Sequence, residues 1–346
     1  MPALLSMPLA LLIAAALQQT PASAAPGLEP LQIRYTSDLT DQELRRRWLQ
    51  DPAALGSISL GFVNRGRLIN AVHMPEGDGW ICEHDQLAWG AQETIQALVS
   101  VFTAMRKRFP GSARARLSQI GAREGGYQTP HRSHQSGRDA DISFFYKRDI
   151  APEPGSARER LIDPARNWAL LRTLVTTTDV QLIVVDRAVQ AVLRNHALKS
   201  GEDRTWVDRI FAGGVGGLVQ HEKKHRDHFH VRFYAPRAAE LGQRIQPLLP
   251  LRPEQNLAIH KIKRGQTLGS IARSYGTTIA AILKVNHLDG ARLLRGEQLL
   301  VPLRKPCAEC PQPPPMVVPP RCLPPEAGPG VDVASVGGGQ TGAMSR

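Results

Sequence analysis

The sequence predicts an α+β fold for the larger part of the chain, from about residue 30 to 236, because strand-like and helix-like patterns are mixed along it. Residues 57–63 and 180–185 (VQLIVV) have the length and composition of short strands. Residues 92–108 instead repeat apolar side chains at intervals of three and four, which is typical of an amphipathic helix. With 346 residues and 42% hydrophobic side chains, the chain is long enough for such a core and for a further domain.

The second half of this region continues the same mixture. Residues 164–176 place apolar side chains on one helical face, and residues 188–196 are also helical. A glycine-rich loop at 213–217 separates them from a strand expected at 228–234. We therefore expect a single α+β domain that ends near residue 236.

The first 24 residues have the composition of an export signal. They are apolar from Leu4 to Leu17, carry no charged side chain and end on the small-x-small sequence ASA at 22–24, which is typical of a cleavage site. We therefore expect an exported protein, periplasmic or associated with the cell wall. No other stretch approaches the ~20 apolar residues of a membrane span, so no transmembrane segment is expected in the mature protein.

The net charge of +12 belongs entirely to the mature chain, because residues 1–24 contain no charged side chain. Such a charge, with a pI near 10.0, predicts an anionic partner. Nucleic acid is one candidate class, but an exported protein meets anionic wall polymer and membrane surface instead. We therefore expect a cell-wall partner and no nucleic acid.

Three segments follow the first domain. Residues 237–257 contain three prolines and are expected to be a linker, and residues 258–302 form a compact second unit. Residues 303–346 are rich in Pro and Gly and have too few apolar side chains to offset their ordering entropy, so we expect a disordered or extended tail. Four cysteines allow three disulfide pairings that the sequence leaves open: Cys82, Cys307, Cys310 and Cys322.

One segment in the middle of the chain, 129–146 (TPHRSHQSGRDADISFFY), is dense in side chains that bind metals or move protons. Polar and apolar residues alternate in its second half, as in a half-buried strand, so that Asp139 and Asp141 share one face. His134 lies in the preceding loop. Gly137 lies between these residues, where a turn would let His134 and Asp141 face one point.

A second segment, 225–233 (HRDHFHVRF), alternates in the same way. His228 and His230 fall on one face, and the apolar residues between and after them are expected to face the core. Because a sheet can bring this polar face beside Asp141, the pattern predicts a metal ion held by His134, Asp141 and His230. Two nitrogens and one oxygen leave a fourth position to water, as in catalytic zinc sites.

Such a site favours hydrolysis of an amide bond. A zinc ion lowers the pKa of a bound water to about 7 and polarises a neighbouring carbonyl. Hydrolysis also needs a proton carrier and a group that stabilises the developing oxyanion. His225 and His228 lie five and two positions before His230, and both are candidates for these roles.

The sequences PHRSHQSGRDADI and HRDHFHVRF resemble the two signature motifs of the penicillin-insensitive murein endopeptidases, within the wider group of zinc peptidases that includes lysostaphin and the D-alanyl-D-alanine dipeptidases. The family's His-x6-Asp falls on His134 and Asp141, and its closing His-x-His falls on His228 and His230. The resemblance covers roughly residues 55–236. It implies a zinc peptidase domain with a small antiparallel sheet flanked by helices.

The resemblance also implies Zn²⁺ as cofactor and a role for six side chains. They are His134, Asp141 and His230 as zinc ligands, His225 and His228 as residues that assist the water and the oxyanion, and His131 as a ligand of a second metal ion. The further ligands that a second ion would need are not recognisable in the sequence. One metal or two therefore remains open at this point.

Residues 260–302 read as two strands with two short helices between them. They resemble the LysM domain, a βααβ module, in the sequence GQTL, in the helix residues that follow it and in the closing Pro302. The resemblance implies a groove for N-acetylglucosamine-containing glycan between the first loop and the loop at 290–294. The candidate glycan-binding residues of the first loop are Gly265, Gln266, Thr267 and Leu268. A βααβ domain that binds protein, or nothing, remains the alternative.

Both domains then address one substrate, which favours an exported endopeptidase that cuts peptidoglycan cross-links, D-alanyl to meso-diaminopimelyl. A carboxypeptidase that removes terminal D-Ala is an alternative, because Arg132 and Arg138 flank the metal motif and could hold a free carboxylate. A catalytically silent wall-binding protein is a third, although such a protein needs no open metal site. The Ser-x-x-Lys and Lys-Thr-Gly motifs of enzymes acylated by β-lactams are absent, so we expect β-lactams not to inhibit the protein.

Overall fold

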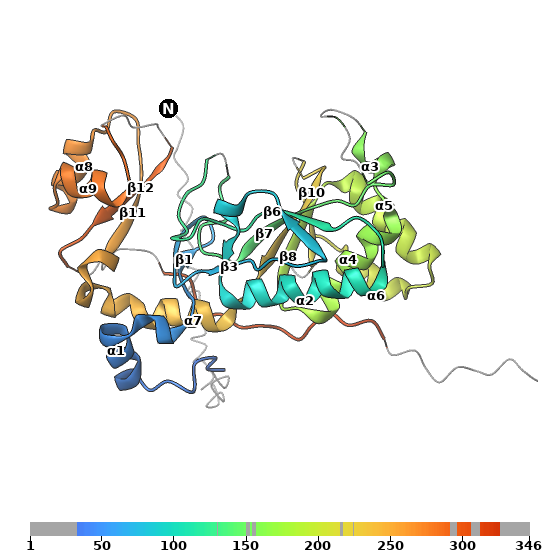
Figure 1. Cartoon of the computed structure of the whole chain (residues 1–346), viewed down its shortest axis with the longest axis horizontal. Helices are drawn as coiled ribbons and strands as arrows, with labels where there is room; N and C mark the ends of the chain where they lie inside the picture. Colours follow the sequence, from blue (N-terminus) through green and yellow to red (C-terminus); the bar gives the residue numbers. More distant parts are fainter. Residues whose placement is uncertain are drawn as a thin grey trace, which may run out of the picture. The chain divides into compact units, whose positions relative to one another are not determined.

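The computed structural model describes most of the chain (Figure 1). The described residues are 33–129, 131–149, 153, 157–214, 217–223, 225–290, 296–305 and 312–325. The expected export signal, Cys307, Cys310 and most of the 290–294 loop lie outside these residues. None of the helices within them combines the length and apolar character that crossing a membrane requires.

A six-stranded sheet forms the centre of the first domain, in the order β4-β6-β7-β10-β8-β9. The strands are β4 (Trp80–Cys82), β6 (Ala115–Gln119), β7 (Asp139–Ser143), β10 (His228–Phe233), β8 (Val180–Val185) and β9 (Val219–His221). The four central strands pair antiparallel, as expected, whereas the short edge strands β4 and β9 pair parallel to their neighbours. These edge pairs differ from the purely antiparallel sheet expected, because each is reached through a helical crossover.

Helices cover one face of this sheet, which leaves the other face for a site (Figure 1). They are α2 (Gln92–Arg108), α4 (Pro164–Thr177), α5 (Arg187–Lys199) and α6 (Arg204–Ile210), whereas the short α3 (Arg158–Leu161) adds no buried side chain to this layer. The apolar side of α2, with Leu98 and Phe102, packs in one cluster with Ile142 and Val231 of the sheet. Helices and sheet together confirm the predicted α+β class.

A second, smaller cluster joins the beginning of the domain to residues 237–257, which the sequence predicted as a linker. The structure differs there: α7 (Pro236–Ile245) and a 3-10 helix (Gln246–Leu251) bury Leu241, Ile245 and Leu249. Proline is compatible with the first turn of a helix, and the spacing of these side chains gives α7 one apolar face. The cluster also contains residues of α1 (Asp41–Gln50) and β1 (Ile58–Phe62), and β1 pairs with β2 (Arg65–Ile69).

The remaining elements of the first domain are short. They are β3 (Val72–His73), which pairs with β5 (Trp89–Gly90), and 3-10 helices at Pro52–Leu55, Asp85–Leu87 and Pro253–Gln255. Ala91, between β5 and α2, donates its N–H to the carbonyl oxygen of Gly137 at 2.8 Å and so connects the start of α2 to the loop before β7.

Residues 257–302 form the expected βααβ unit. Its elements are β11 (Leu257–Lys261), α8 (Leu268–Tyr275), α9 (Ile279–Val285) and β12 (Gln298–Pro302). Thr267 caps α8 through a reciprocal capping box with Ser270, and Gly276 ends the helix in the left-handed conformation, with φ of 64°. The local sequence therefore sets both ends of this helix.

The described part of the tail, 312–325, has no helix or strand and is extended. It hydrogen-bonds to the first domain: the indole N–H of Trp206 donates to the carbonyl oxygen of Cys322 at 2.9 Å, and Arg321 pairs with Asp179 at 2.8 Å. Cys82 and Cys322, the two cysteines that the structure describes, form no disulfide with each other.

Candidate active site

The polar face of the two central strands carries the predicted residues in register. β7 and β10 pair so that His230 lies opposite Asp141 and His228 lies opposite Ser143. The strand period of two places all four side chains on one face, and the apolar residues between them are buried in the core. The convergence that the sequence predicted for these two segments is therefore confirmed.

Asp139 lies at one end of this face and is neutralised by an arginine. It is fully buried, and Arg232 of β10 donates to both of its carboxylate oxygens, at 2.7 and 3.1 Å. Burial alone would raise its pKa, but the charge of Arg232 outweighs that effect and lowers the pKa to about 2. Asp139 also accepts from the backbone N–H of His134 at 3.3 Å, so the pair fixes the loop before β7.

Asp141 has a different environment, although it is only 4% exposed. Its carboxylate oxygens lie 2.8 Å from His230 Nδ1 and 3.2 Å from His134 Nε2, and it accepts from Gln119 Nε2 at 2.9 Å. His228 Nε2 lies 3.7 Å away. Among the residues that the structure describes, no lysine or arginine forms an ion pair with Asp141.

The pKa of Asp141 reflects these imidazoles. Burial alone would raise it, but the charge and hydrogen bond of His134, with the hydrogen bond of His230, hold it well below its usual value. The carboxylate is therefore ionised at neutral pH and has only imidazoles and an amide as near partners.

A strained loop conformation positions His134. Its φ is 69°, in the left-handed region that side chains rarely adopt and that is enriched at functional sites. Its Nδ1 lies 2.9 Å from the carbonyl oxygen of Ile120, which can only accept, so Nδ1 carries the proton and Nε2 is left facing Asp141. The turn at Gly137 has φ of 72°, and a Cβ there would lie 2.6 Å from Leu68, so only glycine fits.

His131, His134 and Asp141 each offer one ligand atom, and these atoms lie within 4.8 Å of one another. Gln119 Nε2 lies 2.9 Å from His131 Nδ1 and thereby holds this half-buried ring beside Asp141. The His230 ring lies on the other side, with its centroid 4.9 Å from that of His134. The group of three therefore contains His131, predicted as a ligand of a second ion, and not His230, although His230 Nδ1 lies 2.8 Å from Asp141.

His225 and His228 complete the cluster. The ring centroid of His225 lies 5.0 Å from that of His228 and 5.7 Å from that of His230. Burial lowers the pKa of His225 to about 4, with a contribution from the two neighbouring imidazoles. Burial would also lower the pKa of His228, but a hydrogen bond to Asp227 at 2.7 Å and the charge of Asp141 outweigh it, and the pKa is raised.

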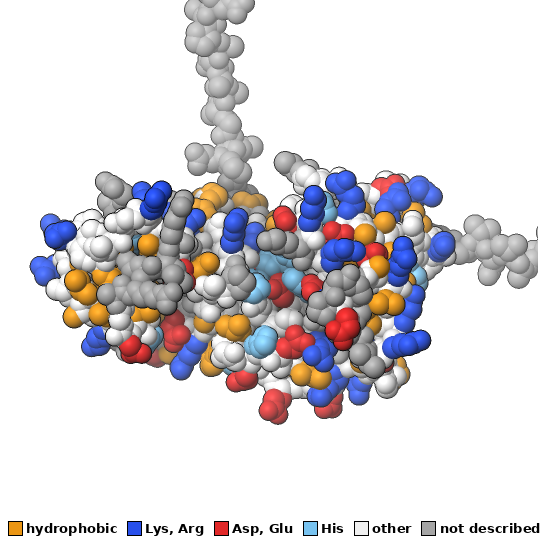
Figure 2. All heavy atoms as spheres, turned by 90° about the horizontal axis from the view of Figure 1, so that it is seen from above, with side chains coloured by type: hydrophobic (Ala, Val, Ile, Leu, Met, Phe, Trp, Pro, Cys, Tyr) orange, Lys and Arg blue, Asp and Glu red, His pale blue; other side chains and the backbone are white. Residues whose placement is uncertain are grey.

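This donor set fits a divalent transition metal. Imidazole nitrogens and a carboxylate are ligands that Zn²⁺ accepts, and the carboxylate has no arginine or lysine partner among described residues. His225 Nδ1 is buried, and none of the described residues hydrogen-bonds to it. Figure 2 shows histidine and acidic side chains together in a hollow of the surface, with Lys and Arg side chains around it.

Comparison with known families gives two matches. A family model described as penicillin-insensitive murein endopeptidase matches residues 59–251, and a LysM domain model matches residues 260–302. The chain belongs to the penicillin-insensitive murein endopeptidase family. It carries a LysM domain at its C-terminal side. No curated protein matches the chain.

Of the two arginines that flank the metal motif in this murein endopeptidase, Arg138 is not available to a substrate. It is 7% exposed and donates to the carbonyl oxygen of Tyr234 at 3.3 Å. Arg132 is exposed. The paired clamp for a free carboxylate that the carboxypeptidase alternative needs is therefore absent from these two positions.

Three residues of the site were missed from the sequence. Asp227 precedes His228 in the HRDHFH motif, and Arg232 is the next same-face residue after His230, so spacing alone could have indicated both. Gln119 belongs to β6 and carries no motif. It is found only once β6 is known to pair with β7.

In the LysM domain, the four candidate glycan-binding residues differ in what they offer. Gly265, Gln266 and Thr267 lie in the loop between β11 and α8, whereas the Leu268 side chain is buried in the core of the domain. The Gln266 side-chain oxygen accepts from the N–H of Lys263 at 2.8 Å and therefore braces the loop. Of the second loop only Gly290 is described.

Proposed function

We propose that this chain is an exported zinc-dependent endopeptidase that hydrolyses D-alanyl-meso-diaminopimelyl cross-links of peptidoglycan. The observation that carries the proposal is the buried carboxylate of Asp141, which has imidazoles on two sides and no arginine or lysine partner among the described residues. A buried charge is costly unless a counter-charge or a metal compensates it. In a member of the murein endopeptidase family, a catalytic metal is the compensation that also explains the histidines.

The residues that would hold the ion are His134, Asp141 and His230, with His131 as a ligand of a possible second ion. A bound Zn²⁺ supplies Lewis-acid chemistry, since it lowers the pKa of a water molecule to about 7 and polarises the scissile carbonyl. His134 Nδ1 is already engaged by Ile120, and this fixes the tautomer that a ligand needs at Nε2. Gln119 orients both His131 and Asp141.

His228 and His225 have complementary roles in the proposal. The Asp227 carboxylate accepts from His228 Nδ1, so Nε2 faces the cluster and can take a proton and pass it to the leaving amine. His225, with a pKa of about 4, is neutral at pH 7 and keeps one ring N–H. That N–H can donate to the substrate oxygen as it gains negative charge.

The second domain and the N-terminus support a location at the cell wall. The LysM domain would hold the enzyme on the glycan strands, so that cross-links near the bound strand are cut first. The net charge of +12 suits an anionic wall, and residues 1–24 support export to the periplasm or wall. Because the proposed mechanism forms no acyl-enzyme, β-lactams should not inhibit it.

The test incubates the mature protein with purified cross-linked sacculi and analyses the released fragments. We expect cross-linked dimers to become monomers, the reaction to stop with chelator and to return with Zn²⁺. His230→Ala should abolish it, whereas His196→Ala on α5 should not. Loss of terminal D-Ala alone would instead indicate the carboxypeptidase, and unchanged fragments with retained binding to the sacculi would indicate a silent binding protein.

A further inference from the structure

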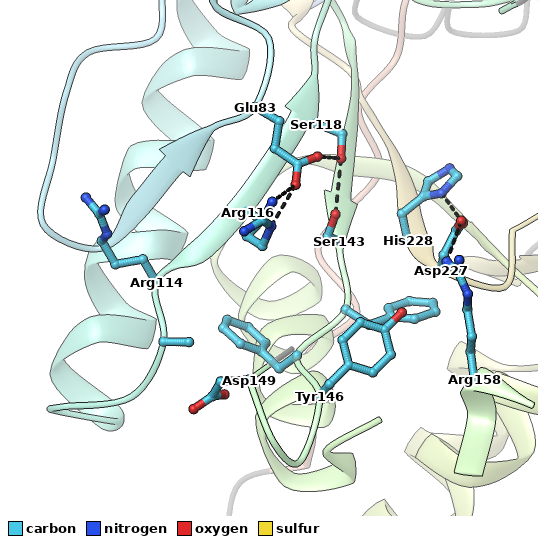
Figure 3. Close-up of a pocket in the computed structure, with 13 residues that line it drawn as sticks. Glu83, Arg114, Arg116, Ser118, Ser143, Tyr146, Asp149, Arg158, Asp227 and His228 are labelled. Atoms are coloured by element: carbon cyan, nitrogen blue, oxygen red, sulfur yellow. Dashed lines mark hydrogen bonds and ion pairs between the residues drawn. The ribbon is translucent and has the colours of Figure 1, made fainter. Parts of the chain in front are cut away.

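A pocket of about 240 Å³ opens beside the histidine cluster (Figure 3). His228 lines it and also faces Asp141, so the pocket and the candidate metal site share one wall. Ser143 continues the polar face of β7 into the pocket, one strand period beyond Asp141. A peptide whose scissile bond lies at the histidines therefore has a neighbouring residue within reach of this pocket.

Two carboxylate–guanidinium pairs give the pocket its chemistry. Arg116 donates to Glu83 at 2.7 Å, and Arg158 donates to Asp227 at 2.7 Å. Figure 3 shows Glu83 and Arg116 on one side and Asp227 and Arg158 on the other.

Between the two pairs, the hydroxyls of Ser118 and Ser143 lie 3.1 Å apart. Ser118 also donates to Glu83 at 2.7 Å, which holds that carboxylate toward the hydroxyls. Both signs of charge thus line one small space, together with neutral hydroxyl groups.

The rim and the floor add two further features. Arg114 lies at the exposed rim and forms no ion pair with any residue that the structure describes. The floor contains Phe144 and Tyr146, whose rings are almost completely buried and present apolar surface to the pocket. A ligand with charged groups at its end and a short hydrocarbon stem would match both.

We propose that this pocket is the subsite for a side-chain end that carries both an ammonium and a carboxylate group, as the free end of a diaminopimelyl residue does. The proposal rests on the proposed function, because the cross-linked substrate supplies this group on the acyl side of the scissile bond. A lysyl end has the ammonium group alone and offers no carboxylate to the guanidinium groups. The methyl group of D-alanine is too small for the space and has no charge.

The test compares three synthetic cross-linked peptides that differ only in the third residue of the acyl-side stem. That residue is diaminopimelyl, diaminopimelyl with its free carboxylate amidated, or lysyl. We expect the full-length enzyme to lose at least about 10-fold in kcat/KM with the second and third peptides, as for the loss of one charge-assisted hydrogen bond. Arg116→Met should remove this discrimination by lowering kcat/KM for the first peptide only.

Two further variants separate recognition from damage to the fold. Glu83→Gln combined with Arg116→Met removes the pair without leaving an unmatched charge and should also lose the discrimination. Arg194→Met is the matched control, since Arg194 pairs with Asp208 outside the pocket, and it should discriminate as the unaltered enzyme does. Equal rates of the unaltered enzyme on all three peptides, or an equal loss on all three in Arg116→Met, would overturn the proposal.

Calorimetric titration with the three uncross-linked stem peptides keeps this inference separate from the proposed function. If the enzyme cuts cross-links but does not prefer the diaminopimelyl peptide, the proposed function is supported and the subsite is wrong. If the protein cuts no cross-link but binds the diaminopimelyl stem at least about 10-fold more tightly than the other two stems, and Arg116→Met removes this difference, the subsite is supported and the proposed function is wrong.

Discussion

Two successive positions on the polar face of β7 hold aspartates in different electrostatic settings. Asp139 is paired with Arg232, whereas two positions away Asp141 is surrounded by imidazoles. Both carboxylates are buried and ionised. A fixed guanidinium makes the first a structural charge, and neutral or titratable partners leave the second able to accept a metal ion. The two positions therefore differ in the partner of the carboxylate and not in the carboxylate itself.

The largest expected effect comes from changing the aspartate without an arginine partner. Asp141→Asn keeps the size of the side chain and removes one ligand oxygen with its charge, so we expect Zn²⁺ retention to fail and kcat/KM on sacculi to fall at least about 10³-fold. Metal content after dialysis and fragment release measure the two effects. A variant that retains bound Zn²⁺ and full activity would show that Asp141 is not a ligand.

The next largest effect is expected for Asp139, as a loss of stability of the fold. Asp139→Ala leaves Arg232 without its partner in a largely buried position, so we expect the free energy of unfolding in urea to fall by about 3 kcal/mol. Asp38→Asn is the matched control, because Asp38 and Arg237 form an exposed pair whose loss should cost under about 1 kcal/mol. An unchanged unfolding curve for Asp139→Ala would show that the Asp139–Arg232 pair does not stabilise the fold.

A third carboxylate tests whether a fixed partner makes a charge structural elsewhere in the domain. Asp163 caps α4 and accepts from the backbone N–H and the side chain of Arg166, at 3.0 and 2.9 Å. Burial would raise its pKa, but these hydrogen bonds outweigh it and lower the pKa. Asp163→Ala should cost about 1 kcal/mol of unfolding free energy at pH 7 without changing kcat/KM.

The lowered pKa of Asp163 determines how its contribution to stability depends on pH. A carboxylate whose pKa is lower in the folded state stabilises the fold above its ordinary pKa, near 4, and loses that contribution as the pH falls through the folded value. The difference between Asp163→Ala and the unaltered protein should therefore be constant from pH 5 to 7 and shrink below about pH 4. A difference that grows on acidification would contradict the assignment.

The core of the site was predictable from the sequence because strand geometry is strict. A period of two fixed which side chains of 139–143 and 228–233 share a face, and the apolar residues between them required that the opposite faces be buried. Gly137 marked the turn for a similar reason, since few other residues adopt its backbone conformation. The family model matches residues 59–251, a range that contains both segments.

The parts that were not predictable depend on contacts distant in sequence. Gln119 becomes a site residue only through the pairing of β6 with β7, which no local pattern encodes. The Glu83–Arg116 pair of the pocket likewise needs β4 beside β6. The helix α7 was not predicted for another reason. The prolines that follow it are typical of a linker, although Leu241 and Ile245 have the apolar spacing of a helix.

The smallest expected effect concerns a hydrogen-bonded pair without charge, in contrast to the aspartates above. Thr267 caps α8 of the LysM domain by accepting from the N–H of Ser270 at 3.1 Å, and Ser270 reciprocates at 3.0 Å. Thr267→Ala should lower the unfolding free energy of this domain by about 0.5–1 kcal/mol, with no change between pH 3 and 7 because neither hydroxyl titrates. Thr267→Ser keeps the hydroxyl and should restore stability. Binding to sacculi that weakens equally in both variants would mean that Thr267 contacts glycan through its methyl group, whereas binding lost only in Thr267→Ala would follow the hydroxyl.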